Sequence, residues 1–399
     1  QEGHEGTTLQ RTDTPDNTVT QPVTHCGNCK KSLKNSLLLG YKSAQSYDIP
    51  KIEIIVTEFL METKGCSCGH ITTAENPPDV TGAVCYGTNI KSLTVLLMQE
   101  HHLPLERASD FIFEITGHRI SEGSFVNWTN TCAANLEKFD ADVVEHIKNA
   151  EVVHADETGI FGKLKWIHVK TTEYVCRYFA HKNRGGKAVL EEGILAFFKG
   201  ILVHDALPLY YSFLLMLHAL CNAHILRELI FFHEEKKMKW AGAMKRLLLK
   251  IKESVDIAKL KGKTKLPEKL IAKYRKRYEA ILRGPLQNYK VIPQIKGKRG
   301  RKKQEPYKNL LDRLLDRADD VLRFMSDFRI PFDNNISERA LRMIKVKMKV
   351  SGCFRSEKGA KSFCLIKTYL ATARKNRCNL FQAIKDSFTK EVRLSAILV

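Results

Sequence analysis

The stretch VVHADETGI (152–160) places two adjacent carboxylates, Asp156 and Glu157, directly after a β-branched apolar run. Such a run is typical of a short buried strand. Burying an unpaired carboxylate is costly, so a carboxylate that ends a buried strand needs a cation as its partner, and that cation could be a metal ion. Asp, Glu and Thr are also common in ordinary turns, so this stretch alone does not separate a metal site from a strand end.

The elements that would position Asp156 are predicted to form a mixed sheet. Apolar patterning predicts strands at 151–157, 163–172 and 173–181, a helix at 186–198, and a fourth strand from residue 200. Three antiparallel strands, followed by a helix that crosses to a parallel fourth strand, are the start of a ribonuclease H-like fold. In that layout the first and fourth strands are central neighbours. Asp156 closes the first and Asp205 closes the fourth, so we expect their carboxylates to face each other at one end of the sheet.

A third acid, Glu338, lies much farther along the chain on a predicted helix. Asp333 or Asn334 would cap the start of this helix. Asn335, Glu338 and Arg342 then fall on one face, at positions i, i+3 and i+7. An ordinary ion pair between Glu338 and Arg342 is the alternative to a catalytic role for this acid.

The overall charge indicates a polyanionic partner. The chain has 399 residues, 43% of them hydrophobic, enough for two or three domains with sizeable cores. The formal net charge is +21, and basic residues cluster in the runs 259–277 and 296–303, which favours nucleic acid as the partner. No signal peptide is predicted. The longest stretch without Asp, Glu, Lys or Arg, 206–226, is interrupted by polar residues and by Pro208, which favours a buried core segment over a membrane span.

Two close pairs stand out among the eleven cysteines. They are Cys26 with Cys29, and Cys66 with Cys68. Two such knuckles, joined by a small β-ribbon, are typical of a structural zinc site with four ligands, and residues 46–62 supply β-forming side chains between them. Because the second pair is the less usual C-x-C, His70 could replace one thiolate. The scattered cysteines and the lack of a secretion signal favour a reducing compartment without disulfides.

These patterns predict an α/β protein with several parts. The expected ranges are a disordered lead at 1–24, a zinc-ribbon domain at 25–82, a helical linker or DNA-binding region at 83–150, the first part of a ribonuclease H-like core at 151–235, a basic helical insertion at 236–330, and the second part of the core at 331–399.

At this point the chain resembles the bacterial DDE transposases of the insertion sequence 66 family. The stretches that carry the resemblance are HCGNCKKSL, KGCSCGH, LPLERASDFIFEITGHRIS, VVHADETGI, CNAHILREL and DNNISERALRMIKVKMKVSGCFRSEKGAKSF. They occur in the family's order and cover most of residues 22–385. The resemblance implies a catalytic triad of Asp156, Asp205 and Glu338.

The implied chemistry is phosphodiester cleavage followed by strand transfer. Two Mg²⁺ ions bound by the triad can stabilise the attacking and the leaving oxygen. Asp156 would bridge the ions, and Asp205 and Glu338 would each hold one. Water frees a 3′-OH at the end of the element, and that 3′-OH then attacks target DNA. Glu157 is expected to support the site from behind or to belong to the turn.

The resemblance also suggests which residues meet DNA. The family's Cys-x-x-His element falls on Cys221 and His224, and His224 would either orient a phosphate or a water molecule or pack in the core. The residues expected to contact DNA are His224, Arg339, Arg342, Lys345, Lys347, Lys349 and Arg355.

The expected partners are double-stranded DNA, further copies of the chain, and accessory proteins encoded by the element, in the bacterial cytoplasm and on the nucleoid. Two alternative functions remain open. One is a metal-dependent nuclease without strand transfer, and the other is a non-catalytic DNA-binding protein derived from a transposase. The terminal-repeat sequence, the target preference and the transposition pathway cannot be predicted from these residues.

Overall fold

The computed structural model describes residues 8–287, 289 and 304–398. The basic run 296–303 and the first seven residues of the predicted lead lie outside these described residues. The chain divides into two compact units, Gln1–Ile55 and Val56–Val399. This division falls inside the range 25–82 that was predicted as one zinc-ribbon domain, so the two cysteine pairs belong to different units.

The described part of the first unit has no helix, and its only β pairing is an isolated bridge between His25 and Ser32. Between them a tight turn closes at Cys26, whose N–H donates to the carbonyl of Lys31 at 2.9 Å. The second unit begins with a hairpin of β1 (Thr63–Gly65) and β2 (Ile71–Thr73). The β-ribbon expected over 46–62 is therefore wrong in position, because the paired strands begin only at residue 63.

Four helices precede the sheet, as the sequence predicted for residues 88–150. They are α1 (Thr88–Gln99), α2 (Leu105–Thr116), α3 (Glu122–Asn135) and α4 (Glu137–Lys148). The side chain of Ser121 caps α3 by accepting from the N–H of Ser124. Phe139 and Val143 of α4 are fully buried and belong to the same apolar cluster as the central strand of the sheet.

A five-stranded mixed sheet with the order β5-β4-β3-β6-β7 forms the centre of the second unit. Its strands are β3 (Val152–Gly159), β4 (Trp166–Thr171), β5 (Cys176–His181), β6 (Ile201–His204) and β7 (Leu217–Leu220). β3, β4 and β5 pair antiparallel, whereas β6 runs parallel to β3 and β7 runs parallel to β6. The first and fourth strands of the core are thus central neighbours, as expected.

Two predicted boundaries in this region are wrong. Asp156 does not close the first strand, because β3 continues to Gly159 in its pairing with β4, and Asp156 lies opposite Val169. The parallel pairing with β6 does end earlier, at His154. The helix expected over 186–198 is only α5 (Gly186–Glu192), since Gly193 adopts φ +73°, a conformation that glycine tolerates and that ends the helix.

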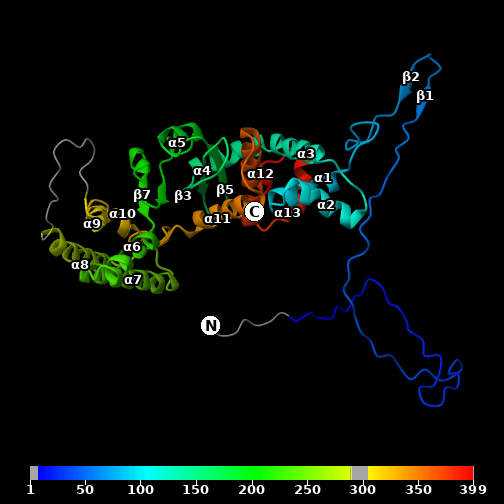
Figure 1. The fold of residues 1–399 in the computed structure, drawn as a ribbon, viewed down its shortest axis with the longest axis horizontal. Coiled ribbons are helices and arrows are strands. Elements are labelled where there is room, and N and C mark those ends of the chain that lie inside the picture. The colour runs from blue at the N-terminus through cyan, green and yellow to red at the C-terminus, as the bar shows by residue number, and fades with distance from the viewer. Residues whose placement is uncertain (1–7, 288, 290–303, 399) are drawn as a thin grey trace. The chain divides into compact units, whose positions relative to one another are not determined.

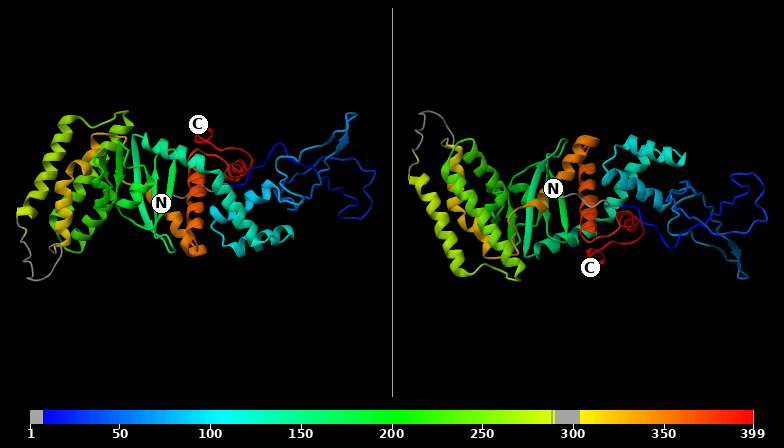
Figure 2. Two further views of the ribbon diagram at one scale, coloured as in Figure 1. Left: turned by 90° about the horizontal axis from the view of Figure 1, so that it is seen from above. Right: turned by 90° about the horizontal axis from the view of Figure 1, so that it is seen from below.

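Helices cover both faces of the sheet. Alternation along β3 directs Val153 and Ala155 toward α4 and α5, and it directs His154 and Asp156 toward the opposite face. On that opposite face lie α11 (Asn335–Ser351) and α12 (Glu357–Lys375), which pack against β3, β4 and β5. In both views of Figure 2 the strands lie between the orange α12 and the yellow-green helices at 239–260 and 268–287.

The described residues between β7 and α11 are mostly helical. They form α6 (Asn222–Glu234), α7 (Lys239–Leu260), α8 (Glu268–Gln287), α9 (Pro306–Asp316) and α10 (Ala318–Leu322), and α7 and α8 lie side by side in Figure 1. The last helix of the chain is α13 (Leu380–Thr389). No helix among the described residues is long and apolar enough to cross a membrane. The core segment expected before His218 is only partly buried, because Leu214 and Leu215 are exposed while Tyr210 is fully buried.

Candidate catalytic site

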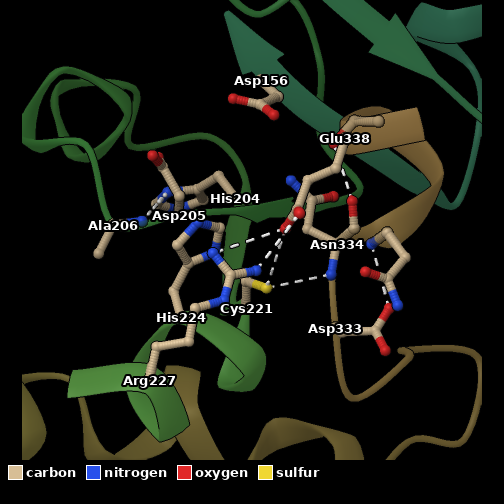
Figure 3. A network of polar contacts seen from close by, with 12 residues as sticks. Asp156, His204, Asp205, Ala206, Cys221, His224, Arg227, Asp333, Asn334 and Glu338 are labelled. Atoms are coloured by element: carbon tan, nitrogen blue, oxygen red, sulfur yellow. Dashed lines mark hydrogen bonds and ion pairs between the residues drawn. The ribbon is translucent and has the colours of Figure 1, made fainter. Parts of the chain in front are cut away.

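Three elements bring the predicted acids to one region of the structure. Asp156 comes from the middle of β3, Asp205 directly follows β6, and Glu338 lies in the first turn of α11 (Figure 3). Asp156 and Asp205 are both partly buried. Their charges interact with each other, and the charge of Glu338 also acts on Asp156. The three acids therefore lie in one region of the structure, and Asp156 lies in the middle of its strand and not at its end, where the sequence had placed it.

The neighbouring carboxylates Asp156 and Glu157 point to opposite faces of the sheet, because successive strand residues alternate. Glu157 is buried and accepts hydrogen bonds from the guanidinium of Arg184 at 2.7 and 2.9 Å. The hydroxyl of Tyr210 donates to its other oxygen at 2.7 Å. Glu157 is thus a paired structural anchor behind the site, and it does not belong to a turn.

Burial raises the pKa of both aspartates. The pKa of Asp156 rises to about 7, chiefly through desolvation, and the charges of Glu157, Asp205 and Glu338 add to the rise, while the N–H of Glu157 opposes it. Desolvation also raises the pKa of Asp205, reinforced by the charge of Glu157. Within the described part of the chain, neither aspartate has a Lys, Arg or His nitrogen within ion-pair distance. Two desolvated carboxylates without a cation are the donor set that a divalent metal ion fits.

Glu338 has partners of its own. One carboxylate oxygen lies 3.6 Å from Nδ1 of His224 and accepts from Sγ of Cys221 at 3.9 Å. The other oxygen lies 3.4 Å from the guanidinium of Arg227. Figure 3 shows the carboxylate directed at these three side chains. The alternative ion pair between Glu338 and Arg342 is not formed.

Asn334 connects the start of α11 to the central strand β3 by hydrogen bonds. Its amide donates to the carbonyl of Ala155 at 2.9 Å, and its amide oxygen bonds to Nδ1 of His154 at 2.8 Å. Burial lowers the pKa of His154 to about 4, so this imidazole is neutral and donates through Nδ1. Asn334 is the N-cap residue of α11, but its side chain makes no capping hydrogen bond. The carboxylate of Asp333 accepts from the N–H of Asn335, the first residue of the helix, at 3.1 Å.

A comparison with known protein families identifies the family of this chain. A family model described as the transposase IS66 family matches residues 83–362. The chain belongs to the IS66 transposase family. A comparison with curated proteins found no match. The matched range contains all three acids and begins after both cysteine pairs. Membership implies that the protein binds DNA and is an enzyme of DNA transposition.

Four of the basic side chains predicted to contact DNA are exposed on the transposase. They are Arg339, Arg342, Lys349 and Arg355. Lys345 is also exposed, and its ammonium donates to the carbonyl of Gly159 at the end of β3. Lys347 is placed differently from the prediction, because it is partly buried over the rings of Phe354 and Phe363, and desolvation lowers its pKa to about 8.

A cavity of about 740 Å³ lies elsewhere on the transposase, beside α11 and α12. None of the three acids lines it, whereas Arg339 and Lys367 do. Lys367 is already bound to Glu100 at 2.7 Å.

The roles of Arg227, of the contacts between Asn334 and β3, and of Arg184 and Tyr210 were not predicted from the sequence. Arg227 could have been found, since it lies three residues after His224 on the same predicted helix face. The other contacts are long-range and leave no local pattern.

Proposed function

We propose that this IS66-family protein is a DDE transposase that cleaves the ends of its element and joins the freed 3′-OH to target DNA. Asp156, Asp205 and Glu338 would hold Mg²⁺, and β3 to β7 with their helices would be a ribonuclease H-like core interrupted by a helical insertion at α7 to α10. The observation that carries this proposal is the pair of desolvated aspartates, one in β3 and one directly after the neighbouring strand β6, without a cationic partner. When bound, Mg²⁺ supplies charge stabilisation for the attacking and leaving oxygens.

The chain's own residues set the geometry for this chemistry. Glu157, held by Arg184 and Tyr210, fixes β3 from the far face and keeps Asp156 in place. Asn334 ties the helix of Glu338 to the same strand. The exposed arginines of α11 would hold the phosphates of the DNA. A homo-oligomer on paired ends, accessory proteins of the element and association with the nucleoid belong to the same proposal.

A two-stage assay tests this function. Purified protein is given Mg²⁺ and DNA that carries the terminal sequences flanking its own gene, once intact and once with a pre-cleaved 3′ end. We expect cleavage of the first substrate and joining of the second to target DNA. Cleavage without joining would identify a nuclease, and DNA binding without either reaction would identify a non-catalytic binding protein.

We also propose a structural zinc ion at the cysteine pairs. Each pair forms a tight turn in which backbone amides point at the first sulfur, and these hydrogen bonds lower the pKa of Cys26 and of Cys66. Amide donors of this kind stabilise the thiolate form, which is the form that binds zinc.

At the cysteine pairs, freshly purified protein is expected to hold one zinc ion per chain, with Cys26, Cys29, Cys66 and either Cys68 or His70 as its ligands. Metal analysis of unchelated protein measures the content. Cys26→Ser should release the zinc, whereas Cys353→Ser, which changes an exposed cysteine outside both pairs, should retain it. Protein that is free of zinc from the first purification step would refute the site.

DNA affinity is expected to fall steeply with salt, with a log–log slope of about −0.9 for each phosphate contacted. Changing Arg339, Arg342 and Lys349 to Gln should make that slope shallower by up to about 2.7, three phosphate contacts at this value. Titration of duplex DNA at several salt concentrations measures the slope. The matched control changes three exposed lysines outside the two basic runs, Lys138, Lys187 and Lys199, and removes the same net charge. Equal slopes in both triple variants would show that α11 has no special role in binding DNA.

A further inference from the structure

Cys221, His224 and Glu338 form a cluster whose chemistry differs from that of the three acids. Their potential ligand atoms, one sulfur, one imidazole nitrogen and one carboxylate oxygen, all lie within 4.8 Å of one another. Among the described residues this is the one such group of three. We infer that these three side chains form a binding site for a thiophilic divalent metal ion of the Zn²⁺ class.

The spacing of the cluster is close to what such an ion requires. Tetrahedral zinc with bonds of about 2.0–2.3 Å separates its ligand atoms by roughly 3.3–3.6 Å. In the structure the carboxylate oxygen of Glu338 lies 3.6 Å from Nδ1 of His224 and 3.9 Å from Sγ of Cys221. The ligand atoms of Cys221 and His224 lie within 4.8 Å of each other, so side-chain adjustments of up to about 1 Å would complete the set. Three protein ligands leave a fourth position open, as in zinc sites that bind water or substrate.

The surroundings of the sulfur independently support metal binding. Cys221 is buried at the N-cap of α6, and its Sγ accepts from the N–H of Asn334 at 3.2 Å. The backbone N–H groups of Ala223 and His224 also point at this sulfur. Burial raises the pKa of the Cys221 thiol, the charge of Glu338 adds to this rise, and the three amide donors oppose it. The same three donors would stabilise the thiolate once a metal ion displaces the proton. The Nδ1 atom of His224 is buried and has no hydrogen-bond partner, so it is available as a ligand.

The ligand types indicate which metals would enter. Mg²⁺ prefers oxygen ligands only, whereas thiolate and imidazole favour Zn²⁺ and related transition metals. This part of the inference needs no assumption about activity. Its consequence rests on the proposed function. A thiophilic ion bound here would hold Glu338 beside α6, away from the pair of aspartates, and would compete with Mg²⁺ for the third acid.

The site is tested with Co²⁺ as the probe and with the full chain freed of metal by a chelator. Cobalt bound to a thiolate gives a charge-transfer band in the near ultraviolet. We expect the parent to bind one more Co²⁺ per chain than Cys221→Ser and to show a stronger band, because the two cysteine pairs contribute equally to both proteins. Cys353→Ser is the matched control and should behave like the parent. His224→Gln, a change at a partly exposed residue, should weaken binding at this site at least about tenfold through loss of one ligand.

Equal stoichiometry and equal bands in the parent and Cys221→Ser would overturn the inference. If circular dichroism shows that Cys221→Ser does not fold, parent-like cobalt affinity in His224→Gln overturns it instead. The experiment contains no DNA. A protein that never cleaves DNA could still show the difference band, and an active transposase without the band would refute this metal site alone.

Discussion

Asp156→Asn and Asp205→Asn are each expected to lower the rate of DNA cleavage by at least about a thousandfold. Each substitution removes a carboxylate from the proposed Mg²⁺ site but keeps the shape of the side chain. Metal ions contribute several kcal/mol to the stabilisation of such transition states, and about 1.4 kcal/mol corresponds to tenfold in rate. A single-turnover cleavage assay in Mg²⁺ measures the loss, and DNA affinity measured beside it should stay near the parental value.

Asp316→Asn is the matched control for this comparison. Asp316 is an exposed residue at the end of α9, and the same chemical change there should leave cleavage within about twofold of the parent. Glu157→Ala is a poor control, because it would leave Arg184 and Tyr210 without their partner and disturb the strand itself. If Asp205→Asn cleaves at the parental rate, the assignment of the three acids is wrong.

In metal-free buffer Asp156→Asn is expected to be more stable than the parent at pH 8. The folded-state pKa of Asp156 is about 7, against 3.8 without the fold. Between these values the unfolded chain has released the proton and the folded chain still holds it, so parental stability falls as the pH rises toward 7 and stays low above it. The shift corresponds to at most about 4 kcal/mol, and partial exposure lowers the expected gain to on the order of 1–3 kcal/mol.

Urea denaturation at pH 4 and at pH 8, with a chelator present, measures this difference. The gain should be present at pH 8 and small at pH 4, which lies close to the pKa of 3.8 without the fold, so that the aspartate is protonated in the folded parent and partly protonated in the unfolded chain. Added Mg²⁺ should then stabilise the parent more than the variant, because only the parent keeps all three carboxylates. A variant that is no more stable than the parent at pH 8 would show that the charged form of Asp156 does not destabilise the fold. Asp316→Asn again serves as the control.

Much of the sheet could be predicted from local patterns. Alternating apolar residues marked β3 to β6, and chain order alone made β3 and β6 neighbours, since a crossover helix joins parallel strands. Strand ends were less predictable. The sequence suggested that β3 stops at its acids, but pairing with β4 carries it to Gly159, and no local pattern reports the length of a partner strand. The prediction of a β-ribbon over 46–62 was wrong for the same reason. Apolar and β-branched residues form a strand only where a second strand is available to pair with them.

The candidate site was predictable in its acids and not in its supports. A carboxylate after an apolar run stands out in any sequence, so Asp156 and Asp205 could be chosen. Glu157 looked similar, and only the alternation of strand residues together with the distant Arg184 separates its role from that of Asp156. Cys221 and His224 were recognised as a local pair, yet their meeting with Glu338 depends on how α6 and α11 pack, which no spacing encodes.

The hydrogen bonds of Asn334 have a consequence for how this protein can change over evolutionary time. Glu338 is positioned by Asn334, four residues before it, which forms hydrogen bonds with the backbone of Ala155 and the ring of His154. The position of the third acid is therefore set close to residue 334 as well as by the path of the chain between α6 and α11. The buried faces of the helices in that interval pack against α6, β6 and β7 and are constrained, whereas their exposed faces do not touch the acid. Those exposed faces can change and acquire new surfaces while the position of the acid stays the same.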